Sequence, residues 1–523
     1  MTEQKHAEQT HTSHRVRSGS ITYGRAISFT VDGQTYTGRA GDTIASALLA
    51  NGRIRVGDSI YRRRPRGILS AGAEEPNAFV LVEGEHNESM LPATRVEISE
   101  GMSVRMLEGI GQLDPRPDKD EYDKSTIYAE VAVIGSGPAG LAAAQAAAVS
   151  GKRVVLFEQD HAFGGTLLDC APNDETSVID GLPAAQWAEQ TVRELRESGN
   201  VRLLSRTTVV GSYDNNYLVA LEDRDSAYKA AGEIRHEGVS RQRLWHVVAG
   251  EVVLATGAFD RPLVFANNDI PGIMLASAVQ RYLGRCGVLA GQKIVLFTTH
   301  DSPYRTAVDA ARAGAEVTVV DSRADSAAAD TARAAGVEVR LGSAVVEAEG
   351  TDRLEAVWVA PRGREEQAER LSADLLAVSG GLSPNVHLHS QRQGRMYWYD
   401  QLAGFIPAAP VERQHTVGAL NGSYSLARAL AEGTAAGAAA AAGEASSFYD
   451  SETAAARVAE TGQADQLWFV PGRNKEQQLG AEAEQLSALA EYFVDFQRDN
   501  TVRDIIRASG AGMLSVEIGR AHV

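Results

Sequence analysis

Cysteine is scarce in this sequence, because Cys170 and Cys286 are the only two among 523 residues. A disulfide framework or a cysteine-built metal centre is therefore not expected, and we expect no metal site. A surplus of positive charge is also absent, since the formal net charge is -17. This balance argues against nucleic acid and against an anionic membrane surface as the main partner.

Long apolar runs are missing as well. The longest candidate, TAAGAAAAAGEA at 434–445, is mostly alanine and is too short to span a bilayer. Residues 1–20 lack the apolar core of a signal peptide, so we expect them to form a disordered tail. These absences predict a soluble, cytoplasmic protein with no membrane partner. What is present is 44% hydrophobic residues in a chain long enough for two to four domains.

Residues 21–112 carry the signals of a small α+β domain. ISFTVDGQTYT alternates around Asp32-Gly33, which predicts a hairpin. GDTIASALLANG then predicts a helix with Asp42 as its N-cap, and more strand-like segments follow. Strands, one helix and further strands in this length favour a β-grasp fold. The polar, proline-rich residues 113–125 are expected to be a linker.

The pattern changes after the linker to an apolar strand, a glycine turn, an alanine-rich helix and a second strand, which is a βαβ unit. A second unit at 291–323 interrupts the first domain. We therefore expect an α/β protein with a FAD/NAD(P)-binding, Rossmann-type domain over 126–445. An inserted second subdomain over 286–374 makes it a flavoprotein type with two dinucleotide-binding domains. The sequence from 446 to 517 is helical and charged in character.

The first βαβ unit contains the fingerprint VAVIGSGPAG. Gly135 permits the tight turn, Gly137 lets the backbone approach a pyrophosphate, and Gly140 allows close packing of helix on strand. The helix start offers free N–H groups and a positive dipole end to phosphates. Glu158 closes the second strand, where its carboxylate can accept both adenosine ribose hydroxyls and would repel a 2′-phosphate. The unit therefore predicts a dinucleotide other than NADP.

Two further segments are candidates for the same site. FGGTLLD at 163–169 places a glycine pair just past Glu158, although an ordinary turn explains it equally well. LATGA at 254–258 would let small residues approach the ligand at a chain crossing.

The second unit lacks a phosphate cradle. Its turn reads FTTHDSP at 297–303, with no glycine, and Pro303 removes a donor from the helix start. Asp321 remains at the second strand end, so the fold signals persist. We therefore expect no route for hydride from NADPH. His300 and Asp301 could form a catalytic pair, but a polar loop with a helix cap is the commoner alternative, and the catalytic residues stay unknown.

A family resemblance emerges from RPRGI followed by AGAEEPNA. These residues resemble the N-terminal domain of the alpha subunit of heterotetrameric sarcosine oxidase, as do VIGSGPAGLAAA, ATGAFDRPLVFANNDIPGIM, FTTHDSPYR and GALNGSYSLARALAEG further on. That domain is ferredoxin-like, and cluster-bearing relatives have a C-x4-C-x2-C loop after the RPRG turn. The same spacing here falls on Ser70, Glu75 and Ala78. We therefore expect the fold without an iron–sulfur cluster.

The resemblance implies NAD in a largely structural role at the first site, with FAD as the alternative. Where related flavoproteins use a late Gly-Asp to hold FAD, this chain has GALNG, and Asn421 supplies no carboxylate, which favours NAD. The implied cofactor-binding residues are Gly135, Gly137, Pro138, Ala139, Gly140, Glu158, Gly164, Gly165, Thr166, Val209, Thr256, Gly257, Gly418, Asn421 and Gly422.

The resemblance also implies partners and a reaction. Beta, gamma and delta subunits would complete a heterotetramer that oxidatively demethylates sarcosine and passes electrons to oxygen, with FMN shared between beta and alpha. Tetrahydrofolate would bind a C-terminal aminomethyltransferase-like domain, which 446–517 would lead to and which this chain lacks. EIGRAHV resembles a translated sequencing adapter, so 518–523 are expected to be an artefact. The alternatives are another secondary-amine dehydrogenase, for proline or an opine, and a cofactor-bearing assembly subunit without turnover.

Overall fold

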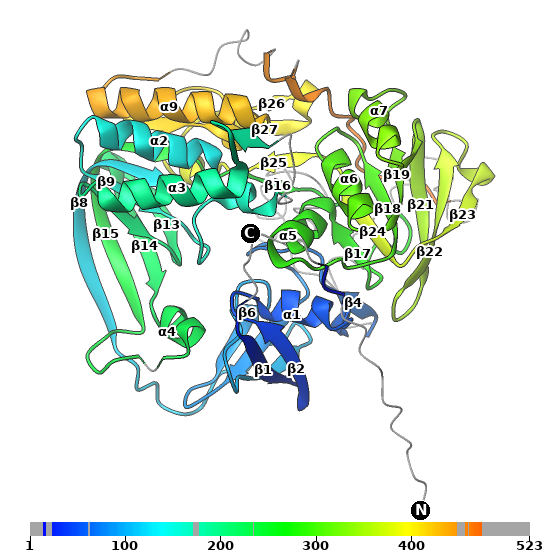
Figure 1. Cartoon of the computed structure of the whole chain (residues 1–523), viewed down its shortest axis with the longest axis horizontal. Coiled ribbons are helices and arrows are strands. Elements are labelled where there is room, and N and C mark those ends of the chain that lie inside the picture. Colours follow the sequence, from blue (N-terminus) through cyan, green and yellow to red (C-terminus); the bar gives the residue numbers. More distant parts are fainter. Residues whose placement is uncertain are drawn as a thin grey trace, which may run out of the picture.

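The computed structural model describes residues 14–16, 24–60, 63–170, 177–233, 235–446, 456–458 and 460–472. The expectations for 473–517 and 518–523 therefore lie outside the described residues. Figure 1 shows an N-terminal part at the bottom in blue and two larger α/β parts above it. Within the described ranges, no helix has the length and apolar character needed to traverse a membrane.

The N-terminal part is a five-stranded mixed sheet that packs against one helix. Its strand order is β2 (Gln34–Arg39), β1 (Ala26–Val31), β7 (Ser103–Leu107), β5 (Phe79–Glu83) and β6 (Glu88–Pro92), with α1 (Ile44–Ala50) and the pair β3 (Arg55–Asp58) and β4 (Pro65–Gly67). The predicted hairpin is confirmed, because β1 and β2 pair around Asp32 and Gly33. Both residues have positive φ, as the tight turn requires.

The N-cap of α1 is Thr43 and not Asp42. Thr43 and Ser46 form a reciprocal capping box, which satisfies the first backbone donors of the helix. Asp42 is buried one residue earlier, where its carboxylate accepts bonds from the Ser46 hydroxyl at 2.8 Å and the Arg39 N–H at 2.7 Å. The start of the chain also differs from the expected tail. His14 N–H bonds to Ala50 O, and Arg15 forms a bridge with Val288.

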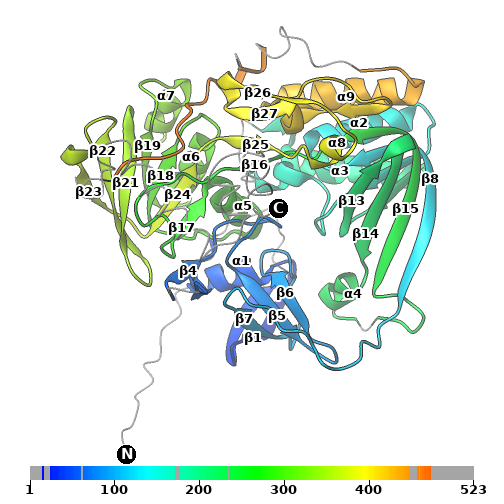
Figure 2. The same cartoon turned by 180° about the vertical axis from the view of Figure 1, so that it is seen from behind.

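The second part is a seven-stranded sheet in which the central strands run parallel. Its order is β12 (Val201–Leu204), β9 (Val154–Phe157), β8 (Tyr122–Ile134), β15 (Gln242–Leu254), β14 (Tyr217–Asp223) and β13 (Thr207–Tyr213), with β28 (Gln414–Thr416) also beside β15. Helices α2 (Pro138–Val149), α3 (Ala184–Glu197) and α9 (Leu426–Ala442) lie together on one side of it (Figures 1 and 2). Because β8 begins at Tyr122, the strand takes in the end of the expected linker 113–125.

The inserted part has a parallel sheet of its own. The order is β17 (Ile273–Leu275), β24 (Leu375–Ser379), β18 (Lys293–Thr298), β19 (Glu316–Asp321) and β20 (Glu338–Arg340), with α5 (Ala276–Cys286), α6 (Tyr304–Arg312), α7 (Ala327–Ala334) and the three-stranded sheet β21 (Ser343–Gly350), β22 (Leu354–Pro361) and β23 (Glu369–Ser372). This part is wider than the expected 286–374, because the buried strands β17 and β24 pair with each other outside those limits.

Short elements join these parts. They are the pairs β10 (Val178–Ile179) with β11 (Leu182–Pro183), β16 (Ala258–Asp260) with β25 (Leu382–Pro384) and β26 (Met396–Tyr399) with β27 (Gly404–Pro407), together with α4 (Asp225–Ala231) and α8 (His387–Gln391). Residues 462–472 are not helical, unlike the expectation for 446–517. Gly462 has a φ of 74°, a left-handed conformation that ends a helix.

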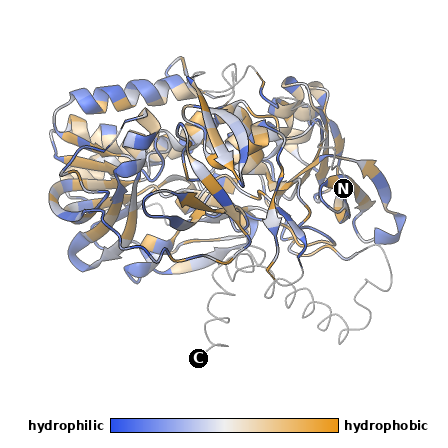
Figure 3. Cartoon of the chain, turned by 90° about the horizontal axis from the view of Figure 1, so that it is seen from below, coloured by the Kyte–Doolittle hydropathy of each residue, from blue (hydrophilic) through white to orange (hydrophobic). Residues whose placement is uncertain are grey.

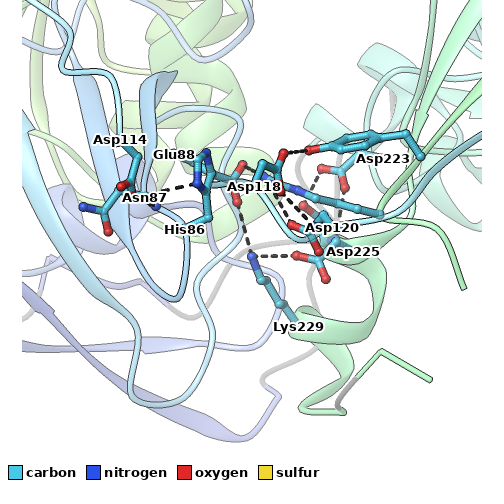
Figure 4. Close-up of polar contacts among 12 residues, drawn as sticks. His86, Asn87, Glu88, Asp114, Asp118, Asp120, Asp223, Asp225 and Lys229 are labelled. Carbon is cyan, nitrogen blue, oxygen red and sulfur yellow. Dashed lines mark hydrogen bonds and ion pairs between the residues drawn. The ribbon is translucent and has the colours of Figure 1, made fainter. Parts of the chain in front are cut away.

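Apolar packing and ion pairs fix the parts against one another. One core cluster runs from Ile27 and Leu48 in the N-terminal part to Leu296 in the inserted part. Figure 3 shows hydrophobic strands inside and hydrophilic outer helix faces. The linker is held by polar contacts that include Arg241 to Asp120 at 3.0 Å and Lys229 to Glu88 at 3.5 Å (Figure 4).

Candidate dinucleotide site

The phosphate turn lies between β8 and α2, and its glycines are required sterically. Gly135 has a φ of 95°, and a Cβ at Gly135 or Gly140 would lie well inside 3.0 Å of backbone oxygens. At Gly137, by contrast, no described atom lies within 4 Å of the place that a Cβ would take. Gly137 is the N-cap of α2, and no described side chain caps this helix. The turn therefore presents free N–H groups beside open space, which is what a pyrophosphate needs.

Glu158 follows β9 at the same edge of the sheet. The side chain is buried, and its Oε2 accepts bonds from Ser136 N–H at 3.1 Å and from Ser136 Oγ at 2.6 Å. Its Oε1 accepts from Asp160 N–H at 2.8 Å. Burial, together with the nearby Asp160 charge, raises the pKa of Glu158. Ser136 thus fixes the carboxylate next to the phosphate turn, where a ribose would follow the pyrophosphate.

The glycine pair of FGGTLLD lies directly on the phosphate turn. A Cβ at Gly165 would come 2.8 Å from Gly137 Cα, and Gly164 N–H bonds to Ser136 Oγ at 3.0 Å. This close approach of two backbones explains why both positions are glycine. Thr166 follows with an exposed side chain at the start of the short 3₁₀ turn Gly165–Asp169.

The remaining predicted residues divide into two groups. Thr256 and Gly257 follow β15 at the same edge, where Ala255 O lies against Gly135 and Thr256 Oγ1 bonds to Asn385 O at 2.8 Å. Val209 packs farther away, on the β13 edge of the sheet, against the cluster that contains Phe157.

The late glycine turn is placed against the start of α2. A Cβ at Gly418 would lie 2.9 Å from Ala139 Cβ, so the 3₁₀ turn Gly418–Asn421 adjoins the phosphate site. Asn421 itself is buried, and its amide donates to Thr416 O at 2.5 Å. Glu432 of α9 accepts from Gly418 N–H at 2.9 Å. The Asn421 side chain therefore stabilises this turn from within, and Gly422 beside it packs on Leu402.

Sequence reasoning missed Asp160, at which all three parts meet. Its carboxylate pairs with Arg95 of the N-terminal part at 3.0 Å and with Arg281 and Arg285 of α5. These guanidinium groups hold the pKa of Asp160 well below its usual range, against the opposing effect of burial. Arg285 also donates to Gly165 O at 2.9 Å. The network therefore fixes the glycine loop and borders a cavity of about 160 Å³.

The inserted part does not bring His300 and Asp301 together as a catalytic pair. His300 is buried and bonds through Nε2 to Ser379 Oγ at 2.6 Å, and the same hydroxyl donates to Asp260. Burial lowers the pKa of His300 to about 3 and raises that of Asp260 to about 6. Asp301 instead accepts bonds from Arg323 and Ser326. Both residues therefore have partners that hold the turn in place.

The loop after the RPRG turn is organised around Glu75. Its buried carboxylate accepts four backbone N–H bonds, from Leu69, Ser70, Asn77 and Ala78, at 2.6 to 3.1 Å. Several backbone donors that converge on one carboxylate form an anion-binding nest.

Two family models match the chain. Residues 24–109 match the model described as a 2Fe-2S iron-sulfur cluster binding domain. The expectation of no iron–sulfur cluster is contradicted by this match, which assigns the domain to a cluster-binding family. Both cysteines of the chain lie outside the matched residues, so the side chains of this segment do not fit a set of thiolate ligands. We derive no step through a cluster.

The chain is also similar to named proteins. It is 46% identical to the sarcosine oxidase alpha subunit of Corynebacterium sp. (strain P-1) over 95% of this chain and 51% of that protein. It is 34% identical to the sarcosine oxidase alpha subunit of Rhizobium meliloti (strain 1021) over 97% of this chain and 53% of that protein. The chain thus spans about half the length of the curated relatives it matches. The resemblance found in the sequence is confirmed.

More distant relatives extend the comparison. One of the opine oxidase subunits of Agrobacterium tumefaciens (strain Ach5) is 33% identical over 38% of each chain. The crystal structure of L-proline dehydrogenase from P. horikoshii shares the fold, with a TM-score of 0.62, 18% identity and coverage of 88% of this chain and 82% of the other. The second family model, pyridine nucleotide-disulphide oxidoreductase, matches residues 129–398, slightly more than half of the chain. The chain therefore belongs to the pyridine nucleotide-disulphide oxidoreductase family.

Proposed function

We propose that this chain is the nucleotide-binding half of the alpha subunit of a multi-subunit sarcosine oxidase. The observation that carries the proposal is the 46% identity to a sarcosine oxidase alpha subunit over 95% of this chain. In this role the chain takes part in oxidative demethylation of sarcosine, in which oxygen is reduced to peroxide. Beta, gamma and delta subunits are the proposed partners, and the FMN is shared with the beta subunit.

The resident ligand of the first site in this proposal is NAD. Free N–H groups at the start of α2 suit the pyrophosphate, and Glu158, fixed by Ser136, suits an unphosphorylated ribose. Gly165 and Gly418 bring two more backbone segments up to the same turn. Asn421, which faces into its own turn, offers no carboxylate to a flavin. Bound NAD would supply fixed charge and packing, with this chain's residues acting to bind and orient it.

A second candidate substrate class has its own support. An opine oxidase is among the relatives, and the solved structure that shares the fold is that of an L-proline dehydrogenase. The alternative function is therefore oxidation of another secondary amine, such as proline or an opine, by the same assembly. A third alternative is a subunit that bears a nucleotide and has no turnover.

Co-expression tests the proposal. The tagged chain should be purified alone and together with the beta, gamma and delta subunits of a sarcosine oxidase, and each sample tested for flavin absorbance and for peroxide. We expect no peroxide from the chain alone, because one wall of a flavin site buries too little of the ligand to hold it. The assembly should be yellow and should release peroxide with sarcosine faster than with proline or an opine.

Three outcomes would contradict parts of this account. Peroxide from the chain alone would exclude the scaffold role. A beta subunit that never co-purifies would exclude an FMN interface within these residues. Faster turnover of proline or an opine than of sarcosine would favour the alternative substrate class.

A further inference from the structure

The carboxyl edge of the inserted sheet is the place where an open parallel sheet of this kind binds a nucleotide. β18 ends there at Thr298, and β19 ends at Asp321, the position of a ribose-binding acid. Asp321 is fully buried, and its oxygens accept bonds from Tyr304 Oη at 2.8 Å and from Arg323 Nη2 at 2.7 Å. The protein's own donors therefore already satisfy this carboxylate.

A segment from the far end of the described chain crosses this edge. We call residues 462–470 the strap. In Figure 2 it is the orange stretch that runs from the α9 side of the molecule towards the inserted sheets. Asp465 N–H donates to Thr299 O at 2.8 Å, in the glycine-free turn, and Arg323 Nη1 donates to Gln463 O at 3.1 Å. The strap is thus bonded to both strand ends at which a nucleotide would lie.

The side chain of Asp465 takes the polar groups that a phosphate would need. Its Oδ2 accepts from Ser322 Oγ at 2.7 Å and from Arg362 Nη1 at 2.6 Å. A serine hydroxyl and an arginine just past the second strand are the donors typical of a site for a ribose phosphate. Here a carboxylate from the same chain occupies them.

The strap is anchored beyond the edge as well. Trp468 lies between Arg261, whose guanidinium carbon is 4.5 Å from the indole centroid, and Trp398, at 5.7 Å between centroids. Val470 is buried in the core of the inserted part, and its N–H donates to Val264 O at 2.8 Å. Aromatic, cationic and backbone contacts therefore hold both sides of Asp465 in place.

We infer that the strap is the permanent occupant of the nucleotide edge of the inserted part. Asp465 acts as an internal substitute for a nucleotide phosphate, and the edge is closed to NADPH. This inference rests on the contacts of 462–470 alone and does not depend on the proposed oxidase function.

Hydrogen–deuterium exchange of the whole chain, with and without millimolar NADPH, tests the inference. We expect the amides of Asp465 and Val470 to exchange as slowly as those of β18, because each donates to a fixed carbonyl. NADPH should change nothing in the strap. Rapid exchange of these amides, or faster exchange when NADPH is added, would overturn the inference, since the strap would then be a displaceable lid.

A matched pair of variants sharpens the test. Asp465→Ala should speed exchange of the strap about tenfold, because two charge-assisted or hydroxyl bonds are lost, while β18 keeps its protection. Asp330→Ala is the control, since it removes an exposed ion pair with Arg333 on α7. Should Asp465→Ala fail to fold, Ser322→Ala removes one donor to the same carboxylate and should give a smaller effect of the same sign. Strap exchange equal to that of the control would contradict the role of Asp465.

Discussion

Replacing Gly433 by valine should lower the free energy of unfolding by about 3 kcal/mol, because α9 packs directly on the backbone of α2. A Cβ at Gly433 would lie well inside 3.0 Å of Ala139 O, and one at Gly437 equally close to Ala143 O. α2 cannot retreat, since its start forms the phosphate turn against Gly135. The same variant should therefore also lose the dinucleotide.

Gly433→Ala and Thr434→Ala make the comparison sharper. Each change gains helix propensity, by up to about 1 kcal/mol at the glycine. Thr434 is exposed on the same helix, so its replacement should leave stability unchanged or slightly higher. Gly433→Ala should nevertheless be less stable than the wild type in urea unfolding followed by circular dichroism. Equal stability of the two alanine variants would mean that α9 and α2 do not pack at this distance.

Asp160→Ala should cost about 3 kcal/mol, the lower end of the range for removing one partner of a buried ion pair. The change leaves Arg95, Arg281 and Arg285 without the carboxylate that joins the three parts. Arg285 is the most buried of them, with 6% of its side chain exposed, so water can compensate little. Asp330→Ala, in an ion pair whose carboxylate is 90% exposed, is the control and should cost less than about 1 kcal/mol.

The pH dependence of this effect has a definite sign. The pKa of Asp160 is depressed in the folded protein, so its contribution is complete above the pKa of an unfolded aspartate, about 4. That contribution is lost as the pH falls through the folded pKa. Unfolding free energies measured between pH 7 and pH 3 should therefore converge for the wild type and Asp160→Ala on the acid side. A constant difference across this range would show that the carboxylate charge is not what stabilises the junction.

The local features of the fold were predictable because they depend on neighbours in sequence. The turn at Gly135–Gly140 needs glycine for steric reasons that the spacing alone reveals. The hairpin at Asp32-Gly33 is equally local. The N-cap of α1 was wrong by one residue, since Asp42 and Thr43 are both good caps and only the contacts of Ser46 decide between them.

Long-range contacts could not be read from the sequence. Asp160 meets Arg95 and Arg285 across 65 and 125 positions, and no spacing links them. Asn421 was expected to face the ligand, but its amide turns inward to Thr416 O because the turn leaves that carbonyl without a helical partner. Residues 462–470 carry a helix-like composition, yet their bonds to Thr299 and Val264 hold them extended. The absence of cluster cysteines also did not reveal that residues 24–109 belong to a cluster-binding family.

The central claim is that the first βαβ unit holds NAD. Mass spectrometry of the small molecules released when the purified, undialysed protein is denatured tests it most directly. Glu158, oriented by Ser136 beside the open N–H groups of α2, should select an unphosphorylated ribose. The account therefore predicts about one equivalent of NAD per chain and no NADP. Release of stoichiometric FAD or NADP in place of NAD would contradict it.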